Sequence, residues 1–424
     1  MGPVLQSLLG LAALPFIAWL FSEDRRAIAG RELVKLCAAG IAVQLVLAVV
    51  LLRVPQSRVI FTGMDRAVAV LQAATEEGLQ FVFGYLAGGP TPFRIVAPEY
   101  TFVLAFRALP LILLMSVLSR LLYHWGILQK VVAGFSWALE RTLGVGGALG
   151  TSAAANIFLG MVEAPLLIRP YVRTMGRGAL FATMTVGMAG VAGTVMALYA
   201  SFLERLVPGA AGHILVASIM SVPAALIISR IMVPHGFSDN GVVALEVEKA
   251  DQPASSMDAV AQGTSEGIQL LAYVVAMLVV MIALVALANG IIGALGQMFG
   301  LTLSLQRILG WIAAPVAWLI GIPAAEMQTA GALIGIKTVL NELLAYLEMA
   351  RTPETALSPR SRLILTYGLC GFANLGSLGI LIGGMTAMAP ERRAEIVELA
   401  PRTLLAGTLA TLLTGAVVGL VVWP

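Results

Sequence analysis

The sequence predicts an all-α integral membrane protein with eight transmembrane helices, two re-entrant helical hairpins and interfacial amphipathic helices. Of the 424 residues, 59% are hydrophobic and 12% are charged, and the mean hydropathy is +0.93. Soluble domains carry about 25% charged residues. Apolar runs recur at the length that crosses a bilayer as a helix, about 20 residues. Two polar stretches, residues 156–166 and 335–342, interrupt apolar sequence and hold Glu163 and Glu342.

Eight apolar runs are the expected crossings. They are residues 4–21, 33–53, 102–123, 179–204, 213–233, 266–294, 361–388 and 402–423. The first run lacks a preceding basic segment and a small-residue cleavage site, so we expect a retained span rather than a signal peptide. Basic residues gather at positions 25–35 and 392–402. Because basic loops face the cytoplasm, eight crossings put both termini on the periplasmic side.

The segments between the crossings differ in character. Residues 56–86 mix charges with spaced aliphatic residues, which indicates an amphipathic helix in the membrane interface or, alternatively, a soluble loop helix. Residues 87–100 are rich in glycine and proline and are predicted to form a loop. Residues 234–264 are polar and are predicted to be a surface loop between two halves. Residues 299–321 are expected to form an amphipathic or tilted helix. Arg107, inside the third run, is most simply explained by a position near a helix end.

Residues 141–175 and 322–350 are too polar and too broken to be plain crossings. Each is predicted to be a re-entrant hairpin, which a membrane tolerates only where protein shields it or where it lines a cavity. A carboxylate at bilayer depth costs a few kcal/mol unless it faces water, a partner or a substrate. We therefore expect Glu163 and Glu342 to share an aqueous cavity. A matched pair of broken segments is typical of a transporter with two related halves.

An internal repeat supports this organisation. Residues 187–193 and 371–377 lie 184 positions apart, and both interrupt an apolar run with small residues. The order of hairpin, broken span and span thus occurs twice, which favours an inverted repeat. Small residues in a helix centre either permit close packing or permit local unwinding, which frees carbonyl and amide groups to bind an ion or a solute.

Other classes of protein are disfavoured. The net charge of +3 is small and scattered, so no nucleic-acid partner is expected. Cys37 and Cys370 lie in apolar runs and fit neither a disulfide framework nor a metal site. The sequence has no nucleophile–base pair and no phosphate-binding loop, so we expect neither an enzyme nor a cofactor. A non-transporting sensor or assembly protein remains as an alternative, although structure alone rarely justifies paired carboxylates inside a membrane.

Four motifs carry a resemblance to a known family. They are Gly-x-Lys-x-x-x-Asn-Glu at 335–342, Glu-Ala-Pro-Leu at 163–166, Gly-Phe-Ala-Asn-Leu-x-Ser at 371–377 and Phe-Arg-Ala-Leu-Pro at 106–110. From about residue 80 to its end, the chain resembles the concentrative nucleoside transporter family.

The resemblance implies a homotrimer of eight-span protomers, each with a stationary scaffold and a moving transport domain. Residues 1–140 (spans one to three and an interfacial helix) would be scaffold, as would residues 234–321 (a loop, span six and an interfacial helix). Residues 141–233 (first hairpin, spans four and five) and 322–424 (second hairpin, spans seven and eight) would transport. The implied activity is ion-coupled import of nucleosides by alternating access across the bacterial cytoplasmic membrane.

The resemblance also implies the substrate-binding residues. Glu342, Asn374 and Ser377 match positions that bind ribose hydroxyls, and vicinal hydroxyls suit an acceptor carboxylate and a two-way amide. Lys337 would be a structural counter-charge or, alternatively, a ligand. The full expected set is Glu163, Glu342, Asn341, Asn374, Ser377, Phe372, Met161, Val162 and Val195.

The chain departs from the family at the base-binding position. The family has Gln-Thr-Glu or Gln-Ser-Glu where this sequence has Met161-Val162-Glu163. Methionine and valine cannot read the polar edge of a base, while Val195 preserves an apolar base contact. The departure predicts looser base recognition, tolerance of purines through the adaptable Met161, or a different solute such as a nucleobase or another ribosyl compound.

A second departure concerns the coupling ion. The family's sodium ligands map to Asn156, the carbonyls of Leu159 and Val191, and a serine hydroxyl at the position of Gly190. Glycine supplies no hydroxyl, so a sodium site at Asn156, Leu159 and Val191 would lack an oxygen. A buried carboxylate can instead carry a proton, and the two glutamates are candidates. The sequence therefore favours coupling to H+ over Na+.

Overall fold

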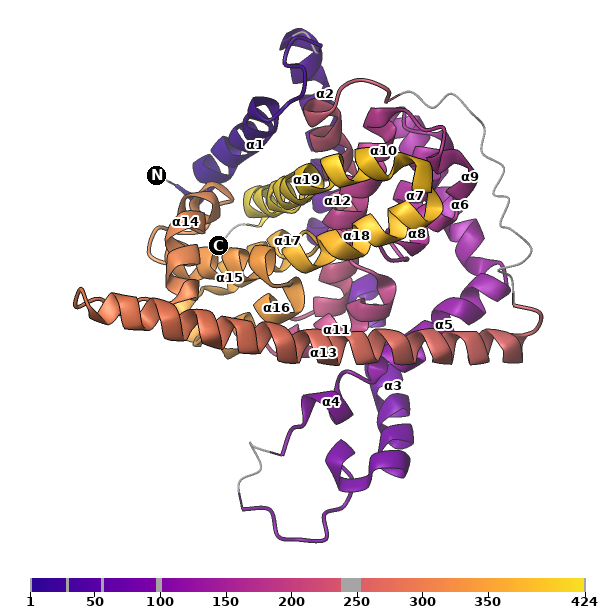
Figure 1. The fold of residues 1–424 in the computed structure, drawn as a ribbon, viewed down its shortest axis with the longest axis vertical. Helices are drawn as coiled ribbons and strands as arrows, with labels where there is room; N and C mark the ends of the chain where they lie inside the picture. Colours follow the sequence, from indigo (N-terminus) through magenta and orange to yellow (C-terminus); the bar gives the residue numbers. More distant parts are fainter. Residues whose placement is uncertain (1, 28–29, 55–56, 97–100, 238–252, 423–424) are drawn as a thin grey trace.

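The computed structural model describes residues 2–27, 30–54, 57–96, 101–237 and 253–422. Throughout these ranges the regular structure is helical, as predicted (Figure 1). The predicted crossings correspond to α1 (Pro3–Leu20), α2 (Gly30–Arg53), α4 (Leu104–Arg107) with α5 (Leu111–His124), α10 (Arg177–Ala189) with α11 (Gly193–Leu203), α12 (Ala210–Met232), α13 (Ser256–Gln297), α17 (Pro359–Gly368) with α18 (Leu375–Met388), and α19 (Arg393–Val421).

Length and composition separate these helices into two groups. Among the described residues, six helical stretches are long and apolar enough to cross a membrane: Gly30–Arg53, Leu104–His124, Arg177–Leu203, Ala210–Met232, Ser256–Gln297 and Pro390–Val421. Three shorter apolar helices are Val4–Leu20, Leu305–Leu319 and Leu375–Met388. The multi-span character is therefore confirmed, and the number of eight spans stays a prediction.

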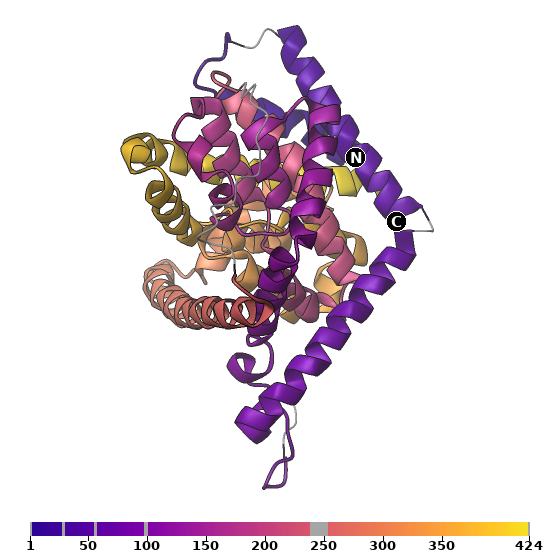
Figure 2. The same ribbon diagram turned by 90° about the vertical axis from the view of Figure 1, so that its right-hand side faces the viewer.

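The amphipathic segments are helices. Residues 56–86 give α3 (Ser57–Phe83) and the 3-10 helix η1 (Gly84–Ala87), and residues 299–321 give α14 (Leu305–Leu319). In Figure 2, α2 and α3 follow each other along one edge of the molecule. Arg107 of α4 lies beside α3, because its guanidinium is 4.0 Å from Glu76, and it also lies over the Phe102 ring at 5.5 Å.

The structure differs from the prediction at two places. Part of the loop predicted at residues 234–264 is helical, and one helix forms where no element was predicted. Residues 256–264 belong to α13, which has 42 residues and begins where the Ser255 hydroxyl accepts a hydrogen bond from the Asp258 amide. The polar residues there form the first turns of a helix that extends past its apolar part, and Ser255 is a favourable N-cap. The additional helix is α6 (Ile127–Leu143), bounded by Gly126 and Gly144 at positive φ.

Both hairpin segments break at their polar stretch. The first contains α7 (Gly147–Ala155), α8 (Glu163–Leu166) and α9 (Arg169–Val172), and the second contains α15 (Met327–Val339) and α16 (Glu342–Arg351). Asn156 and Asn341 lie in the two breaks, and Glu163 and Glu342 are the first residues of the helices that follow them, α8 and α16. Helix–break–helix geometry is thus present in both, while their depth in a membrane stays a prediction.

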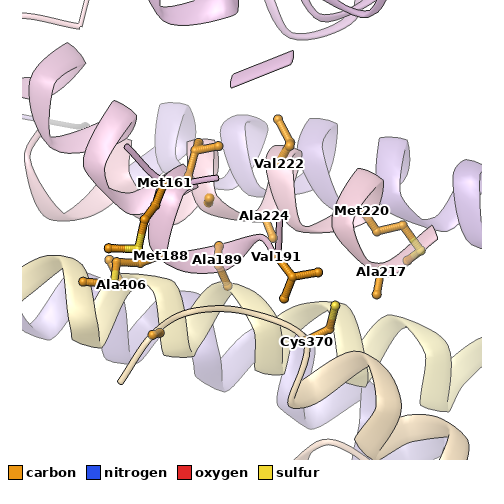
Figure 3. Close-up of a cluster of buried hydrophobic side chains, with 14 of the residues drawn as sticks. Met161, Met188, Ala189, Val191, Ala217, Met220, Val222, Ala224, Cys370 and Ala406 are labelled. Carbon is orange, nitrogen blue, oxygen red and sulfur yellow. The ribbon is translucent and has the colours of Figure 1, made fainter. Parts of the chain in front are cut away.

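The two broken spans meet at their breaks. The Phe372 amide, between α17 and α18, donates to the Gly190 carbonyl, between α10 and α11, at 3.1 Å. A Cβ at Gly371 would lie 2.7 Å from the Ala189 carbonyl oxygen, so only glycine allows this approach. Buried apolar residues, including Met161, Met188 and Val191, surround the point where the two breaks touch (Figure 3). The two repeats are therefore in contact through their breaks, inside the buried core.

The remaining packing joins helices along their lengths, most extensively α14 with α15, and α5 also contacts α11. Helix α5 packs along α13, whereas α1 packs along α19, and α2 packs along α12 and α19. Glu23, after α1, accepts hydrogen bonds from Arg177 and Arg402, each at 2.8 Å. The hydrogen bond from Arg177 holds the pKa of Glu23 below its ordinary value. The connection after α1 is thereby tied to the start of α10 and to the first half of α19.

Candidate functional site

The site is organised around the carboxylate of Glu342. This residue begins α16 and is 3% exposed. The Tyr199 hydroxyl donates to its Oε1 at 2.6 Å, and the Asn374 amide donates to its Oε2 at 3.1 Å. A buried carboxylate is tolerated when donors satisfy its oxygens. Each oxygen here has one donor and retains a lone pair for a further partner.

Two asparagine N-caps fix this geometry. The Asn341 side chain accepts from the Leu344 amide and begins α16, and the Asn374 side chain accepts from the Ser377 amide and begins α18, each at 2.8 Å. Asparagine is among the most favourable N-cap residues. Because its oxygen is held by the helix, the Asn374 NH2 group must face Glu342. The same residue therefore ends the break and orients the carboxylate.

A pocket of about 190 Å³ lies against this network. All nine residues expected to bind substrate line it, so Glu163 and Glu342 border one cavity as the sequence predicted. It is also lined by Gly160, Ala192, Thr194, Tyr199, Leu270, Tyr273, Val274, Met277, Leu278, Leu340, Leu343, Gly376 and Ile380. Both hairpin segments, both breaks and α13 contribute to this wall.

Glu163 stands apart from Glu342 in its surroundings. It begins α8 and is exposed, and it has no hydrogen bond or ion pair with any residue that the structure describes. Its carboxylate lies against Gly160, where an added Cβ would collide with Oε2. Gly160 thus gives the carboxylate room to face the cavity. The two glutamates are different kinds of group, one already partnered and one available.

The Met161-Val162 pair is packed into protein. Met161 is 5% exposed, and its Cβ lies 3.1 Å from the position of a Cβ at Gly187. It belongs to the buried cluster of Figure 3. Val162 lies against Gly384, where a Cβ would be 2.7 Å from a Val162 methyl group. Both residues therefore present only a small part of their surface to the pocket.

The expected ion ligands adjoin the first break. Asn156 is 3% exposed, and its Nδ2 donates to the Val186 carbonyl at 2.8 Å. A Cβ at Gly190 would lie 2.5 Å from that nitrogen, so the Asn156 amide fills the place of a larger side chain. Within the described ranges, the carbonyls of Leu159 and Val191 accept no hydrogen bond. Gly190 supplies no side-chain oxygen, and its carbonyl already accepts from the Phe372 amide, so the two carbonyls and the Asn156 oxygen are the available oxygens at the four expected positions.

Lys337 lies in α15, is 1% exposed and has no hydrogen-bond partner among the described residues. It interacts electrostatically with Glu342. Lys337 is absent from the pocket lining. Its surroundings therefore fit a counter-charge better than a ligand.

Two tyrosines that line the pocket, Tyr199 and Tyr273, were not predicted from the sequence. Tyr199 lies one helical turn after Val195 in α11, and residues at i and i+4 share a helix face. That spacing was a usable signal once Val195 was assigned to the pocket. Tyr273 comes from α13, which had no expected role in the site, and an apolar run contains no signal that selects it.

Three family models match the chain and together span most of its length. They are "Na+ dependent nucleoside transporter N-terminus" at residues 9–86, "Nucleoside recognition" at residues 105–206 and "Na+ dependent nucleoside transporter C-terminus" at residues 213–419.

Individual relatives agree with the family models. An uncharacterized transporter of Haemophilus influenzae is 39% identical, and the alignment covers 98% of this chain and 97% of that protein. The nucleoside permease NupC of Helicobacter pylori is 36% identical over 98% and 97%. The structure of CNTnw in an inward-facing substrate-bound state superimposes with a TM-score of 0.89 at 38% identity, covering 99% and 98%. These relatives are transporters rather than enzymes, and the chain belongs to the concentrative nucleoside transporter family.

Proposed function

We propose that this protein is an ion-coupled symporter that imports nucleosides across a bacterial cytoplasmic membrane by alternating access. The observation that carries the proposal is the buried carboxylate of Glu342, held by Tyr199 and Asn374 at the wall of a pocket. A carboxylate in such a place needs a polar partner. We further propose that the protein works as a homotrimer with both termini in the periplasm.

Ribose would bind at the Glu342 end of the pocket. The free lone pairs of the carboxylate can accept from two vicinal hydroxyls, and the Ser377 hydroxyl can donate or accept. A solute without these hydroxyls would leave the carboxylate without its additional partners, which makes such a site selective. Phe372, Val195 and Asn341 line the same pocket and would complete the contact.

The base would bind at the Glu163 end. Glu163 can accept a base N–H, whereas Met161 and Val162 cannot read a polar edge, and Met161 is buried and Val162 half-buried. Base selectivity would therefore rest mainly on one carboxylate.

A second candidate function follows from Met161 and Val162, namely transport of a free nucleobase or another ribosyl compound. A thermal-shift screen of nucleosides, bases and sugars distinguishes the two, because stabilisation by bases alone would favour the second.

The moving part would contain more of the chain than the resemblance implied. Residues 1–140 were assigned to the scaffold as a block, yet α1 and α2 pack on α12 and α19. Helices that share a large packed surface move together. We propose that α1, α2 and α14, which packs along α15, belong to the transport part and that the scaffold consists mainly of α3, α5 and α13.

A proton is the proposed coupling ion. The Asn156 amide fills the space beside Gly190, and no hydroxyl is available there to complete a sodium site. Sodium is the alternative, favoured by the free carbonyls of Leu159 and Val191 and by the family description. Uptake driven by a pH gradient alone supports the proton, and uptake that requires a sodium gradient at constant pH rejects it.

The test of the whole proposal is uptake into proteoliposomes. Radiolabelled uridine and adenosine should accumulate against their gradients when an ion gradient is imposed. Glu342→Gln should abolish uptake, while Glu348→Gln, an exposed glutamate on the same helix, should leave it unchanged. Absence of accumulation for any nucleoside refutes the substrate, and full activity of Glu342→Gln refutes the role of the carboxylate.

A further inference from the structure

A second cavity adjoins the candidate substrate pocket. It measures about 490 Å³ and lies between α5, α13 and the first hairpin segment. Four residues line both cavities, so the two lie against a shared wall: Gly160, Glu163, Thr194 and Leu270. Small-molecule sites usually measure 300–1,000 Å³, so the outer cavity is large enough to hold a solute of the same class as the inner pocket. A solute leaving the pocket on this side must pass Glu163.

The charges of the outer cavity balance. Arg120 of α5 and Glu266 of α13 form an ion pair through two hydrogen bonds, and Arg169 and Glu163 lie on the hairpin side. Within the part of the chain that the structure describes, these are the four charged residues of the lining, two of each sign. A cavity without net charge offers no net attraction to an anion or a cation. It suits an uncharged polar solute, which a nucleoside is and a phosphorylated nucleoside is not.

The outer cavity also offers neutral hydrogen-bonding groups and aromatic surface. Ser119 of α5 and Gln269 of α13 line it from the side opposite Glu163, and the Tyr123 and Phe158 rings contribute flat apolar surface. Hydroxyl and amide side chains donate and accept without a change in net charge. A base can contact an aromatic face while the ribose finds polar partners. The lining therefore provides both kinds of contact that a nucleoside needs.

We propose that the outer cavity is a second nucleoside subsite, occupied on the way between the inner pocket and the aqueous phase, with Glu163 shared by both positions. This inference rests on the proposed function. The walls of the subsite come from both parts of the molecule, since α5 and α13 belong to the proposed scaffold and the hairpin to the moving part. Movement of the hairpin would dismantle the subsite, so it exists only in conformations that keep these walls together.

The experiment is equilibrium binding of radiolabelled uridine to the purified full-length protein in detergent. Two sites per chain are expected. Gln269→Trp should fill the outer cavity and remove one site, leaving the affinity of the other within about twofold. Ile268→Trp is the matched control, because Ile268 is the preceding residue of α13, is 54% exposed and does not line the cavity. Ser119→Phe, on α5, repeats the test if the first variant unfolds.

The inner site is removed independently by Glu342→Gln, which should leave one site that Gln269→Trp then abolishes. A single uridine site per chain in the unsubstituted protein, lost in Glu342→Gln, overturns the subsite and leaves the proposed function standing. The subsite is also overturned if Gln269→Trp and Ser119→Phe each still bind uridine at two sites per chain. Failure of every nucleoside to bind either site refutes the proposed function instead.

Discussion

Tyr199→Phe tests whether the hydrogen bond to Glu342 organises the site. The change deletes one hydroxyl and keeps the ring, whose centroid lies 5.4 Å from that of Tyr346. The bond is 2.6 Å long and both residues are 3% exposed. A hydrogen bond to a charged group contributes about 1.5–3 kcal/mol. Unfolding should therefore become easier by about that amount, since one Glu342 oxygen loses its donor inside the protein.

Substrate binding should respond selectively. If the hydroxyl fixes the carboxylate for ribose, the affinity for uridine should fall about tenfold, equivalent to about 1.4 kcal/mol. The affinity for 2′,3′-dideoxyuridine, which lacks both hydroxyls, should change less than about threefold. Both are measured by calorimetry or radioligand binding on purified protein, together with thermal unfolding.

Tyr346→Phe is the matched control. Its hydroxyl donates to the Thr366 carbonyl at 2.8 Å in an equally buried position, and the residue does not line the pocket. It should lower stability by about 1 kcal/mol, the usual value for a neutral bond, without changing affinity. Equal losses of affinity for uridine and the dideoxy analogue, or no loss for either, would refute the reasoning.

Three further changes test other parts of the molecule. Glu23→Gln should destabilise the protein by about 1 kcal/mol at neutral pH. The hydrogen bond from Arg177 lowers the pKa of Glu23, so this difference in stability should be present at neutral pH and disappear as the pH falls through that lowered pKa. Thermal unfolding across pH checks it, and a difference independent of pH contradicts it. Met161→Gln with Val162→Thr should increase the discrimination among bases about tenfold in competitive uptake, and an unchanged ratio contradicts a role for this pair. Lys337→Met should weaken nucleoside binding at least about tenfold because the buried carboxylate loses its counter-charge, and unchanged affinity contradicts that role.

The helices were predictable because hydropathy and length determine them almost alone. Residues 256–264 show the limit of this approach. Their polarity indicates a loop, yet a capped helix can extend beyond the apolar surface that it buries, and polarity alone does not distinguish the two cases. Helix α6 was missed for a related reason, since an amphipathic segment between an expected crossing and a hairpin has no apolar run to mark it.

The residues that line the pocket were predictable from the sequence, whereas the hydrogen bonds among them were not. The nine expected substrate residues come from four separate segments, and one pocket gathers all of them. Sequence could not reveal that Met161 lies mostly within the core, because side-chain direction at a break depends on the backbone path. Nor could it reveal Tyr199 as the donor to Glu342, because that contact joins residues 143 positions apart.

The two glutamates illustrate why a pair of similar motifs can serve different purposes. Glu342 is buried, has two side-chain donors and lies near an ammonium group, so its charge and position are fixed before any solute arrives. Preorganisation of this kind lowers the free energy that binding must spend on ordering. Glu163 is exposed, without a partner among the described residues, and faces two cavities. A carboxylate without fixed partners can follow a solute from one cavity to the other, whereas a fixed one cannot, so the asymmetry itself suits a site that must both hold its solute and release it.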